Sequence, residues 1–385
     1  MYIPNMRLTL CILFLSTLRL LAQDIQFSLP IQGTIGRDYY LVNHVDLDTA
    51  TGSVRDFMCG VHTYDGHQGT DFVLRSFRQM DSGVAVIAAA DGVVTAVIDS
   101  LYDRQKKSVK DRGFGNYVAI EHRSGFVSYY AHLRKNSATV RVGDTVTRGR
   151  RLGLVGSSGN SEDPHLHFEV WQRIDPFAGN CSNNASLWKS QPDYSDGFVL
   201  IDHDVTSWPP TLDTLRERPP GQTKFGLTDS TITFWSLQQG VLPTDEITIE
   251  WFTPDNTSWY QYRTTAGIFS QYYYFWSYIQ RPEQTGTWTL QYSVNGVVKL
   301  RDTIQVTGSV QVPIEPDSEV RIVVRQGTII VDDVLGRPAT IEIYDAVGRL
   351  LLRNSGPQLQ GHFPQPVYCV VIVGNRRFVL PMLPE

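Results

Sequence analysis

The stretch Pro164-His-Leu-His-Phe-Glu169 decides how the first half of the sequence is interpreted. Successive side chains of a β-strand point to opposite faces, so residues two apart share a face. On a strand, His165 and His167 would therefore project together and could bind one metal ion, while Leu166 would point into the core. The stretch predicts a strand that carries part of a metal site.

Two further histidine motifs precede this strand. His67 begins His-Gln-Gly-Thr-Asp, which ends at Asp71, and His132 lies in Tyr-Ala-His-Leu. Imidazole nitrogens and a carboxylate oxygen are usual zinc ligands, and three protein ligands with an open fourth position are typical of a catalytic site. His67, Asp71 and one of His165 and His167 would supply these three. The other two histidines would then lie close enough to exchange a proton with a zinc-activated water. Any one of these histidines alone is more simply an ordinary core or surface residue.

Short β-rich runs separated by glycine turns surround the motifs between residues 61 and 190. Runs of this length and spacing are typical of a compact antiparallel sheet. We therefore expect a mostly β domain with no long helix. The runs are Val84 to Ala90, Gly92 to Ile98, Tyr117 to Glu121, Phe126 to His132, Leu152 to Val155 and Leu166 to Trp171.

Taken together, the segment from Gly66 to Val170 resembles the lysostaphin/LytM zinc endopeptidases, whose catalytic domain is an antiparallel-sheet fold with a duplicated hybrid motif. The resemblance lies in several motifs that occur in the family's order. The main ones are His67-Gln-Gly-Thr-Asp71, Ser128-Tyr-Tyr-Ala-His132-Leu, and Gly156-Ser-Ser-Gly-Asn-Ser161 followed by Pro164-His-Leu-His-Phe-Glu169.

The resemblance implies a role for each of five residues. His67, Asp71 and His167 become the ligands of one zinc ion, and His132 and His165 become the catalytic pair that deprotonates the water and stabilises the oxyanion. Which of the pair is the main base stays open. The implied activity is a zinc-dependent endopeptidase, a hydrolase that cuts peptide cross-links of bacterial peptidoglycan or glycine-rich peptides. The alternative is a non-catalytic surface or regulatory protein that binds cell wall with the same domain.

The N-terminus predicts a secretory signal peptide at residues 1–22. Arg7 precedes an apolar run, Leu8 to Leu21, that is shorter than the roughly 20 residues a bilayer requires. No later stretch qualifies, so we expect a mature chain without a transmembrane segment, secreted or on the cell surface, with the periplasm as the alternative. In an exported protein, Cys59 and Cys181 are candidates for a disulfide because they bracket the motifs, and two unpaired thiols are the alternative.

The whole chain, 385 residues with a net charge of -5, is too long for one core and has no basic field to attract nucleic acid. Turn-rich and Pro-containing stretches divide it, and Asn295-Gly296 is a strong hairpin signal. The expected parts are a wrapping segment at 23–60, the peptidase-like domain at 61–190, a linker at 191–224, an immunoglobulin- or fibronectin-like β-sandwich at 225–308, a linker at 309–318 and a β module at 319–385.

The final module resembles the C-terminal sorting domain of type IX secretion substrates, on Ala339-Thr-Ile-Glu-Ile-Tyr-Asp-Ala-Val-Gly-Arg349 and Val367-Tyr-Cys-Val-Val. It departs from that pattern at Gln365-Pro366. The resemblance implies export across the outer membrane by the type IX machinery.

Several other residues carry weaker expectations. The aromatic run from Trp259 to Trp276 favours a packed sandwich core over a surface that stacks on sugars. The loop from Asp99 to Arg112 is expected to be solvated, with a role in specificity left open. Tyr64 and Asn116 are possible groove residues, with a core or turn role as the alternative. His62 is structural or substrate-facing, and His44, His122, His203 and His362 are expected to be solvated or capping.

Overall fold

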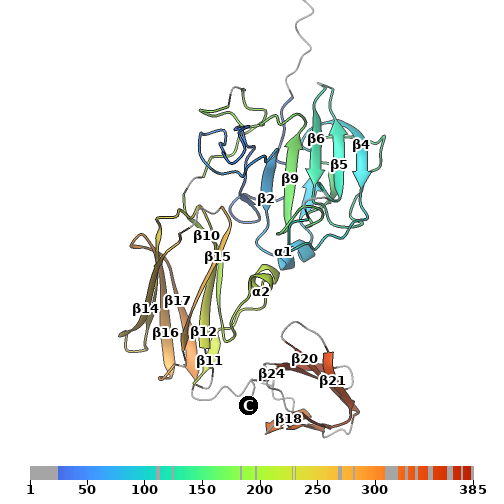
Figure 1. Ribbon diagram of the computed structural model, residues 1–385. Helices are drawn as coiled ribbons and strands as arrows, with labels where there is room; N and C mark the ends of the chain where they lie inside the picture. The colour runs from blue at the N-terminus through green and yellow to red at the C-terminus, as the bar shows by residue number, and fades with distance from the viewer. Residues whose placement is uncertain are drawn as a thin grey trace, which may run out of the picture. The chain divides into compact units, whose positions relative to one another are not determined.

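The computed structural model confirms a mostly β chain built from antiparallel sheets (Figure 1). The signal peptide predicted at 1–22, the linker at 309–318 and His362 lie outside the residues that it describes. The chain divides into two compact units, residues 1–309 and 310–385. The described residues are 25–109, 113–123, 125–182, 184–195, 197–227, 229, 231–267, 271–280, 282–307, 320–325, 328–333, 337–345, 350–361, 367–373 and 376–382.

The N-terminal domain, residues 25–194, is built on a seven-stranded sheet in the order β1-β2-β9-β6-β5-β4-β7. At its centre, β9 pairs with β2 on one side and β6 on the other, which sets Asp71 and Ala131 directly opposite His167. A second sheet pairs β3 (Ala85–Ile87) with β8 (Arg151–Leu154). The seven strands are β1 (Tyr40–Leu41), β2 (Thr70–Val73), β4 (Gly92–Ile98), β5 (Tyr117–Glu121), β6 (Val127–Ala131), β7 (Thr145–Val146) and β9 (His165–Val170).

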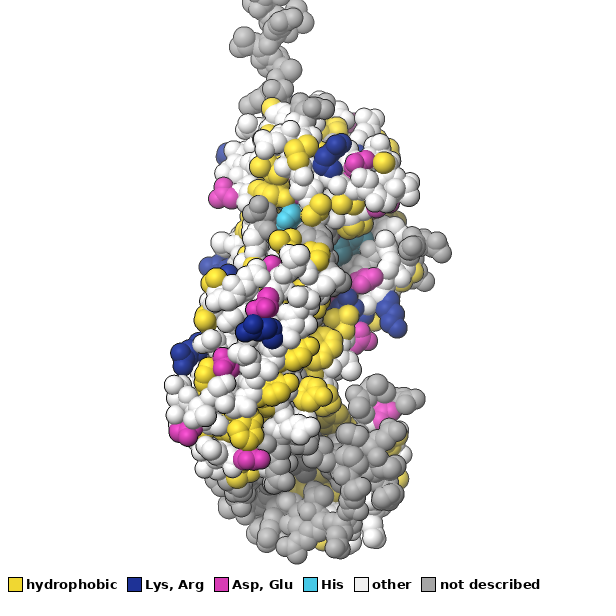
Figure 2. Space-filling view, turned by 60° about the vertical axis from the view of Figure 1, so that its left-hand side comes forward, with side chains coloured by type: hydrophobic (Ala, Val, Ile, Leu, Met, Phe, Trp, Pro, Cys, Tyr) yellow, Lys and Arg dark blue, Asp and Glu magenta, His cyan; other side chains and the backbone are white. Residues whose placement is uncertain are grey.

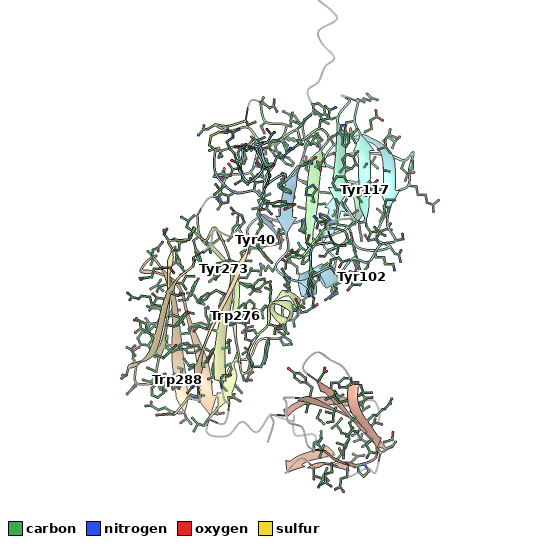
Figure 3. The ribbon with its side chains drawn as sticks, in the orientation of Figure 1. Tyr40, Tyr102, Tyr117, Tyr273, Trp276 and Trp288 are labelled. Carbon is green, nitrogen blue, oxygen red and sulfur yellow. A yellow bond between two sulfur atoms is a disulfide. The ribbon has the colours of Figure 1, made fainter. Side chains whose placement is uncertain are left out.

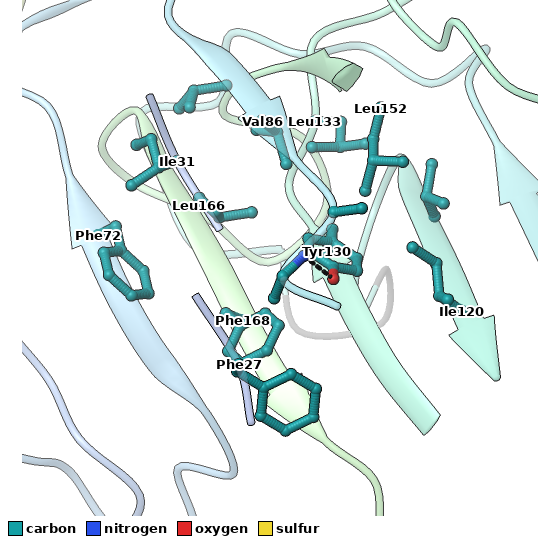
Figure 4. Close-up of a cluster of buried hydrophobic side chains, with 14 of the residues drawn as sticks. Phe27, Ile31, Phe72, Val86, Ile120, Tyr130, Leu133, Leu152, Leu166 and Phe168 are labelled. Carbon is teal, nitrogen blue, oxygen red and sulfur yellow. Dashed lines mark hydrogen bonds between the residues drawn. The ribbon is translucent and has the colours of Figure 1, made fainter. Parts of the chain in front are cut away.

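One face of the seven-stranded sheet forms the hydrophobic core of this domain (Figure 4). Leu166 is fully buried there, as the alternation in its strand predicts. Phe27, far upstream in sequence, is also fully buried and packs edge-on against Phe168. Burying such a ring contributes about 1.5–3 kcal/mol, so the segment before β1 belongs to this core. Tyr130, buried in the same cluster, accepts a hydrogen bond from the Ala89 backbone N–H at 2.8 Å.

A disulfide joins Cys59 and Cys181, the pair expected from the sequence. It spans 122 residues and ties the segment before the histidine motifs to the segment after them. In the chain-entropy model, closing a loop of this length stabilises the folded state by about 4–5 kcal/mol. The chemistry-bearing strands thus lie inside a covalently closed loop.

The sandwich domain, residues 199–307, packs two sheets around one core that includes Trp251 and Trp288 (Figures 1 and 3). One sheet has the order β10-β12-β15 and the other β11-β17-β16-β13-β14, in which β11 pairs with β17 in parallel. The strands are β10 (Val199–Thr206), β11 (Lys224–Gly226), β12 (Thr231–Gln239), β13 (Glu246–Phe252), β14 (Ser258–Thr265), β15 (Tyr273–Gln280), β16 (Gly286–Val294) and β17 (Val297–Thr307).

The hairpin signal at Asn295-Gly296 is confirmed, because these two residues connect β16 and β17 with φ values of 50° and 75°. Left-handed backbone at both central positions is what the tightest hairpin turn requires. The expected linker at 191–224 is wrong as a pure connection, because it contains β10 and the helix α2 (Leu212–Glu217). The sequence does not indicate β10 because two charged residues, Asp202 and Asp204, interrupt its apolar pattern. In the structure Arg218 forms ion pairs with both.

The outer face of the β10-β12-β15 sheet packs against the N-terminal domain. Trp235 and Leu237 of β12 form a buried cluster with Tyr40 of β1 and Leu215 of α2. The Gln239 side chain donates a hydrogen bond to the Leu41 carbonyl at 2.6 Å, and further bonds join Tyr272 to β2's C-terminal neighbours. These contacts make the two domains one compact unit.

The second unit contains two further sheets, in the orders β18-β19-β22 and β21-β20-β23-β24. Cys369 lies fully buried in its core beside Ile341 and Ile343, and burial raises the pKa of its thiol to about 11. Among the residues the structure describes, no helix is both long and apolar enough to span a bilayer. The strands are β18 (Val320–Arg325), β19 (Thr328–Asp333), β20 (Ala339–Asp345), β21 (Leu350–Ser355), β22 (Gln358–Gln360), β23 (Val367–Val373) and β24 (Arg376–Met382).

Candidate active site

Three atoms that can each donate an electron pair to a metal ion lie together where β2 and β9 pair. His67 Nε2, Asp71 Oδ1 and His167 Nδ1 lie 3.0–3.2 Å from one another, and all three side chains are buried. A tetrahedral zinc ion with bonds of about 2.0–2.1 Å places its ligand atoms about 3.3 Å apart. The three atoms therefore have the spacing and the chemistry of a zinc ligand set.

Hydrogen bonds fix which nitrogen of each ring faces this point. His67 Nδ1–H donates to the His44 carbonyl at 2.7 Å, and His167 Nε2–H donates to Glu169 Oε2 at 3.4 Å. The remaining nitrogen of each ring then presents a lone pair to Asp71, whose other oxygen accepts from Asn43 Nδ2 at 2.9 Å. Three acceptors that face each other repel unless a proton or a metal cation lies between them.

The electrostatics of the same three residues point to a cation. Burial raises the pKa of Asp71, but in the metal-free site the imidazoles of His67 and His165 and hydrogen bonds with His167 and His67, when these rings are protonated, hold that pKa well below its usual range. Burial likewise lowers the pKa of His167, yet hydrogen bonds to Asp71 and Glu169 outweigh it and raise the pKa to about 9. A pocket that attracts a proton so strongly favours any positive charge.

His132 and His165 form a second pair beside the donor atoms, with ring centroids 4.6 Å apart. His132 Nδ1–H donates to the Ser158 carbonyl at 2.7 Å and His165 Nδ1–H to the Asp163 carbonyl at 2.8 Å. The Nε2 atom of each ring is left able to accept a proton, and that of His165 lies 3.7 Å from Asp71. Burial lowers the pKa of both imidazoles, so both are neutral at neutral pH and can act as bases.

Two glycines in the motifs leave space that the site requires. A Cβ on Gly69 would lie 2.7 Å from His167 Nε2, so this position must lack a side chain for the ring to take its place. A Cβ on Gly159 would lie 2.4 Å from the Gly115 nitrogen, and Gly159 has φ of +75°. The loop that carries the Ser158 carbonyl can therefore lie directly against residues 113–115, which also bind His132 through Phe114.

The structure brings together all five residues singled out in the sequence, His67, Asp71, His132, His165 and His167, and adds three that were missed. Glu169 lies on the same face of β9 as His165 and His167, a signal that could have identified it. Asn43 and the carbonyl of His44 contact the site from more than twenty residues upstream of His67, and no local pattern marks them.

Some weaker expectations are wrong. His44 is buried between Phe57 and Phe177, with ring centroids at 4.8 Å from each, and His122 is buried and bonded to Ser128. Neither is solvated, because both complete cores that the sequence does not mark. Of the two roles expected for Asn116, the structure favours the turn, because Asn116 is fully buried and bonds the backbones of Leu101 and Leu133.

Two further regions expected near the site differ in how exposed their side chains are. Tyr64 is half exposed and its ring lies 4.4 Å from that of His67, so it can line an approach to the site. The described part of the loop from Asp99 is half-buried, and its Arg104 forms ion pairs with Asp81 and with Glu217 of α2. On the face in Figure 2, histidine side chains show only in recesses among other side chains.

The fold and site together define a mostly β domain with a buried His-Asp-His cluster and two neighbouring imidazoles. Residues 65–179 match the family model described as Peptidase family M23, which supports a peptidase domain of the lysostaphin/LytM type in this region. This match covers all five site residues. It leaves the sandwich domain and the second unit outside.

Known proteins are similar over the same region. The chain is 36% identical over 110 residues to peptidoglycan DD-endopeptidase ShyA of Vibrio cholerae, a match that covers 29% of this chain and 21% of ShyA. It is 37% identical over 110 residues to DD-carboxypeptidase/endopeptidase Mpg of Neisseria meningitidis, with the same two coverages. The catalytic domain of lysostaphin from Staphylococcus simulans is 25% identical, with a TM-score of 0.25 over 36% of this chain and 89% of that one. The chain thus spans about a fifth of the length of the two curated relatives.

Proposed function

We propose that residues 61–190 form a zinc-dependent endopeptidase that hydrolyses peptide cross-links of bacterial peptidoglycan. The observation that carries this proposal is the convergence of His67 Nε2, Asp71 Oδ1 and His167 Nδ1 beside two neutral imidazoles. A three-ligand set with an open position and a nearby base is the arrangement that metal-assisted hydrolysis requires. The names of the relatives that match this region support the substrate class.

In this mechanism His67, Asp71 and His167 hold the metal, and Glu169 and the His44 carbonyl fix the orientation of the rings. Bound zinc would supply Lewis acidity toward the scissile carbonyl and lower the pKa of the attacking water. One of His132 and His165 accepts the proton of that water at Nε2 and returns it to the leaving amine. The other can stabilise the developing oxyanion only as an imidazolium, whose Nε2–H would donate a hydrogen bond to it.

The test uses the chain without residues 1–22, purified with its metal content measured, and incubated with isolated sacculi. We expect about one zinc per chain and release of new amino termini that a chelator abolishes. His132→Ala and His165→Ala should each keep the zinc and lose roughly 10²–10⁴-fold in the rate of release. His203→Ala, in the sandwich domain, is the matched control and should change nothing.

A non-catalytic wall-binding protein would give a different result. It would sediment with sacculi and release no amino termini at any zinc concentration. That outcome would overturn the proposed activity while leaving the metal site intact.

We further propose that the chain is exported and that the module at residues 319–385 acts as a sorting signal for type IX secretion, which truncation after Pro316 would remove. Their separation as a compact unit makes the deletion of these residues a clean experiment. Export should stop in a host that carries the type IX machinery. Export at the full level without them would contradict the sorting role.

A further inference from the structure

One of the two catalytic histidines is held by a turn that another part of the chain supports. His165 Nδ1–H donates to the carbonyl of Asp163, and the same carbonyl accepts from Ser161 Oγ at 2.9 Å. The direction of the His165 ring therefore depends on where residue 163 lies. Its counterpart His132 depends on the Ser158 carbonyl, and Ser158 bonds to Asn116 and Leu133 within the N-terminal domain.

The side chain of Asp163 pairs with Arg216 of α2. Arg216 Nη2–H donates to Asp163 Oδ2 at 3.1 Å, and Nε lies 2.8 Å from Oδ1. The first contact is a hydrogen bond and the second is a close ion pair without hydrogen-bond geometry, and together they hold the carboxylate of Asp163 against the guanidinium. Arg216 is 7% exposed and also donates to the Lys106 carbonyl at 2.7 Å, so both ends of its guanidinium are fixed.

The helix that carries Arg216 is itself fixed to the sandwich domain. Thr211 and Thr214 form a capping box that begins α2, and Leu215 is fully buried against Trp235 and Leu237 of β12. Glu217, next to Arg216, forms ion pairs with Arg104 and Lys106 of the N-terminal domain. Contacts from both domains therefore determine where the guanidinium lies.

We propose that Arg216 is a positioning residue for His165, so that α2 and the sandwich domain are working parts of the catalytic unit. The proposal rests on the proposed function of His165. Arg216 lies outside residues 65–179, the region that matches the peptidase family. It acts through the backbone of residue 163 and does not touch the donor atoms.

The kinetic test is a double-mutant cycle on cross-link release from sacculi. Arg216→Met should lower kcat about 10- to 100-fold, as small misplacements of catalytic groups do, with KM and zinc content unchanged. In a His165→Ala background the same change should have no further effect, because the group it positions is gone. In a His132→Ala background it should keep its full effect. An equal loss in both backgrounds would overturn the proposal.

A spectroscopic readout separates positioning from a general loss of structure. The Nδ1–H of His165 should be protected from solvent exchange in nitrogen NMR of the purified protein, and Arg216→Met should remove that protection while leaving the His132 signal unchanged. Asp163→Asn keeps the backbone carbonyl and weakens the pair, so it should reproduce a smaller part of both effects.

Arg218→Met is the control, because Arg218 pairs with Asp202 and Asp204 inside the sandwich domain. It should leave kcat unchanged. Loss of kcat in this variant equal to that in Arg216→Met would mean that any disturbance of the sandwich lowers activity, which contradicts a specific role for Arg216. Wild-type protein without any peptidase activity would instead overturn the proposed function, and the NMR comparison would still decide the positioning.

Discussion

Two sheet faces in this molecule point away from the core of their own domain and are nevertheless buried, and they differ in the chemistry of their side chains. The face of the N-terminal sheet that lies away from its hydrophobic core buries Asp71, His167 and Glu169. The outer face of the β10-β12-β15 sheet buries Trp235 and Leu237 instead. Both faces are buried, but the buried side chains are polar on the first face and apolar on the second.

The difference teaches how to interpret burial. Burying a polar group costs free energy unless the group has a hydrogen-bond or ionic partner. A cluster of buried polar groups whose acceptor atoms point at one another therefore indicates that the cluster binds a ligand. Apolar groups on an outer face cost nothing once another domain covers them, so they indicate an interface. In this chain α2 lies between the two, since its Leu215 joins the interface and its Arg216 pairs with Asp163 next to the site.

The largest effect should come from removing a charge on the polar face. Asp71→Asn leaves an amide where a carboxylate faces two imidazoles, and we expect zinc binding to fail and activity to fall by at least about 10³-fold, because the metal supplies several kcal/mol of charge stabilisation. Metal analysis after dialysis and release of amino termini measure this. Asp175→Asn is the matched control, because it alters a buried carboxylate of the same domain away from the site. If Asp71→Asn retained zinc, the buried polar face would not be a metal site.

The apolar face should respond in stability and much less in metal binding. Trp235→Ala removes a ring that is 1% exposed, and a loss of about 3–5 kcal/mol in the free energy of unfolding is expected. Trp276, its direct cross-strand neighbour, is 40% exposed, so Trp276→Ala should cost about 1 kcal/mol or less. Urea unfolding followed by tryptophan fluorescence compares the two. Equal losses would mean that the domain interface does not stabilise the unit.

How far the sequence predicts each face depends on how local its signals are. The alternation of His165, Leu166 and His167 predicts which face of the strand each side chain takes, and the five residues that the motifs single out lie together in the structure. Glu169 continues the same alternation and was predictable. Asn43 and His44 could not be predicted, because they lie far from their partners in the sequence and meet them only in the fold. The sandwich core and its hairpin followed from pattern, but β10 did not, since Asp202 and Asp204 acquire their partner, Arg218, only in the fold.

A smaller effect should follow from weakening the support of one ligand. Glu169→Gln keeps the shape of the side chain but removes the charge that holds His167 Nε2–H, so zinc affinity should fall about 10- to 100-fold. Competition with a chromophoric chelator measures it. Glu342→Gln, in the second compact unit, is the control and should leave the affinity unchanged. An unaltered affinity in Glu169→Gln would show that His167 needs no orienting partner.

The last effect, similar in size to that of Glu169→Gln, concerns a buried carboxylate that does not converge with others. Asp175 is 2% exposed, accepts one hydrogen bond, from the Phe177 N–H, and burial raises its pKa to about 7. Asp56 is equally buried, but Tyr194 and three backbone N–H groups satisfy it, and its pKa is lowered.

An acid whose folded pKa is raised binds its proton more tightly in the folded state, so its favourable contribution is complete below the unfolded pKa of about 3.9 and is lost as pH rises through about 7. Between pH 5 and pH 8 the native chain should lose about 1–3 kcal/mol of stability that Asp175→Asn does not lose, since the amide keeps the oxygen that accepts from Phe177 and never ionises. Melting of both proteins at the two pH values tests this. Equal losses of stability in both proteins would mean that Asp175 is solvated or paired. Burial of this single carboxylate would then cost no free energy, and the contrast with the converging residues around Asp71 would be lost.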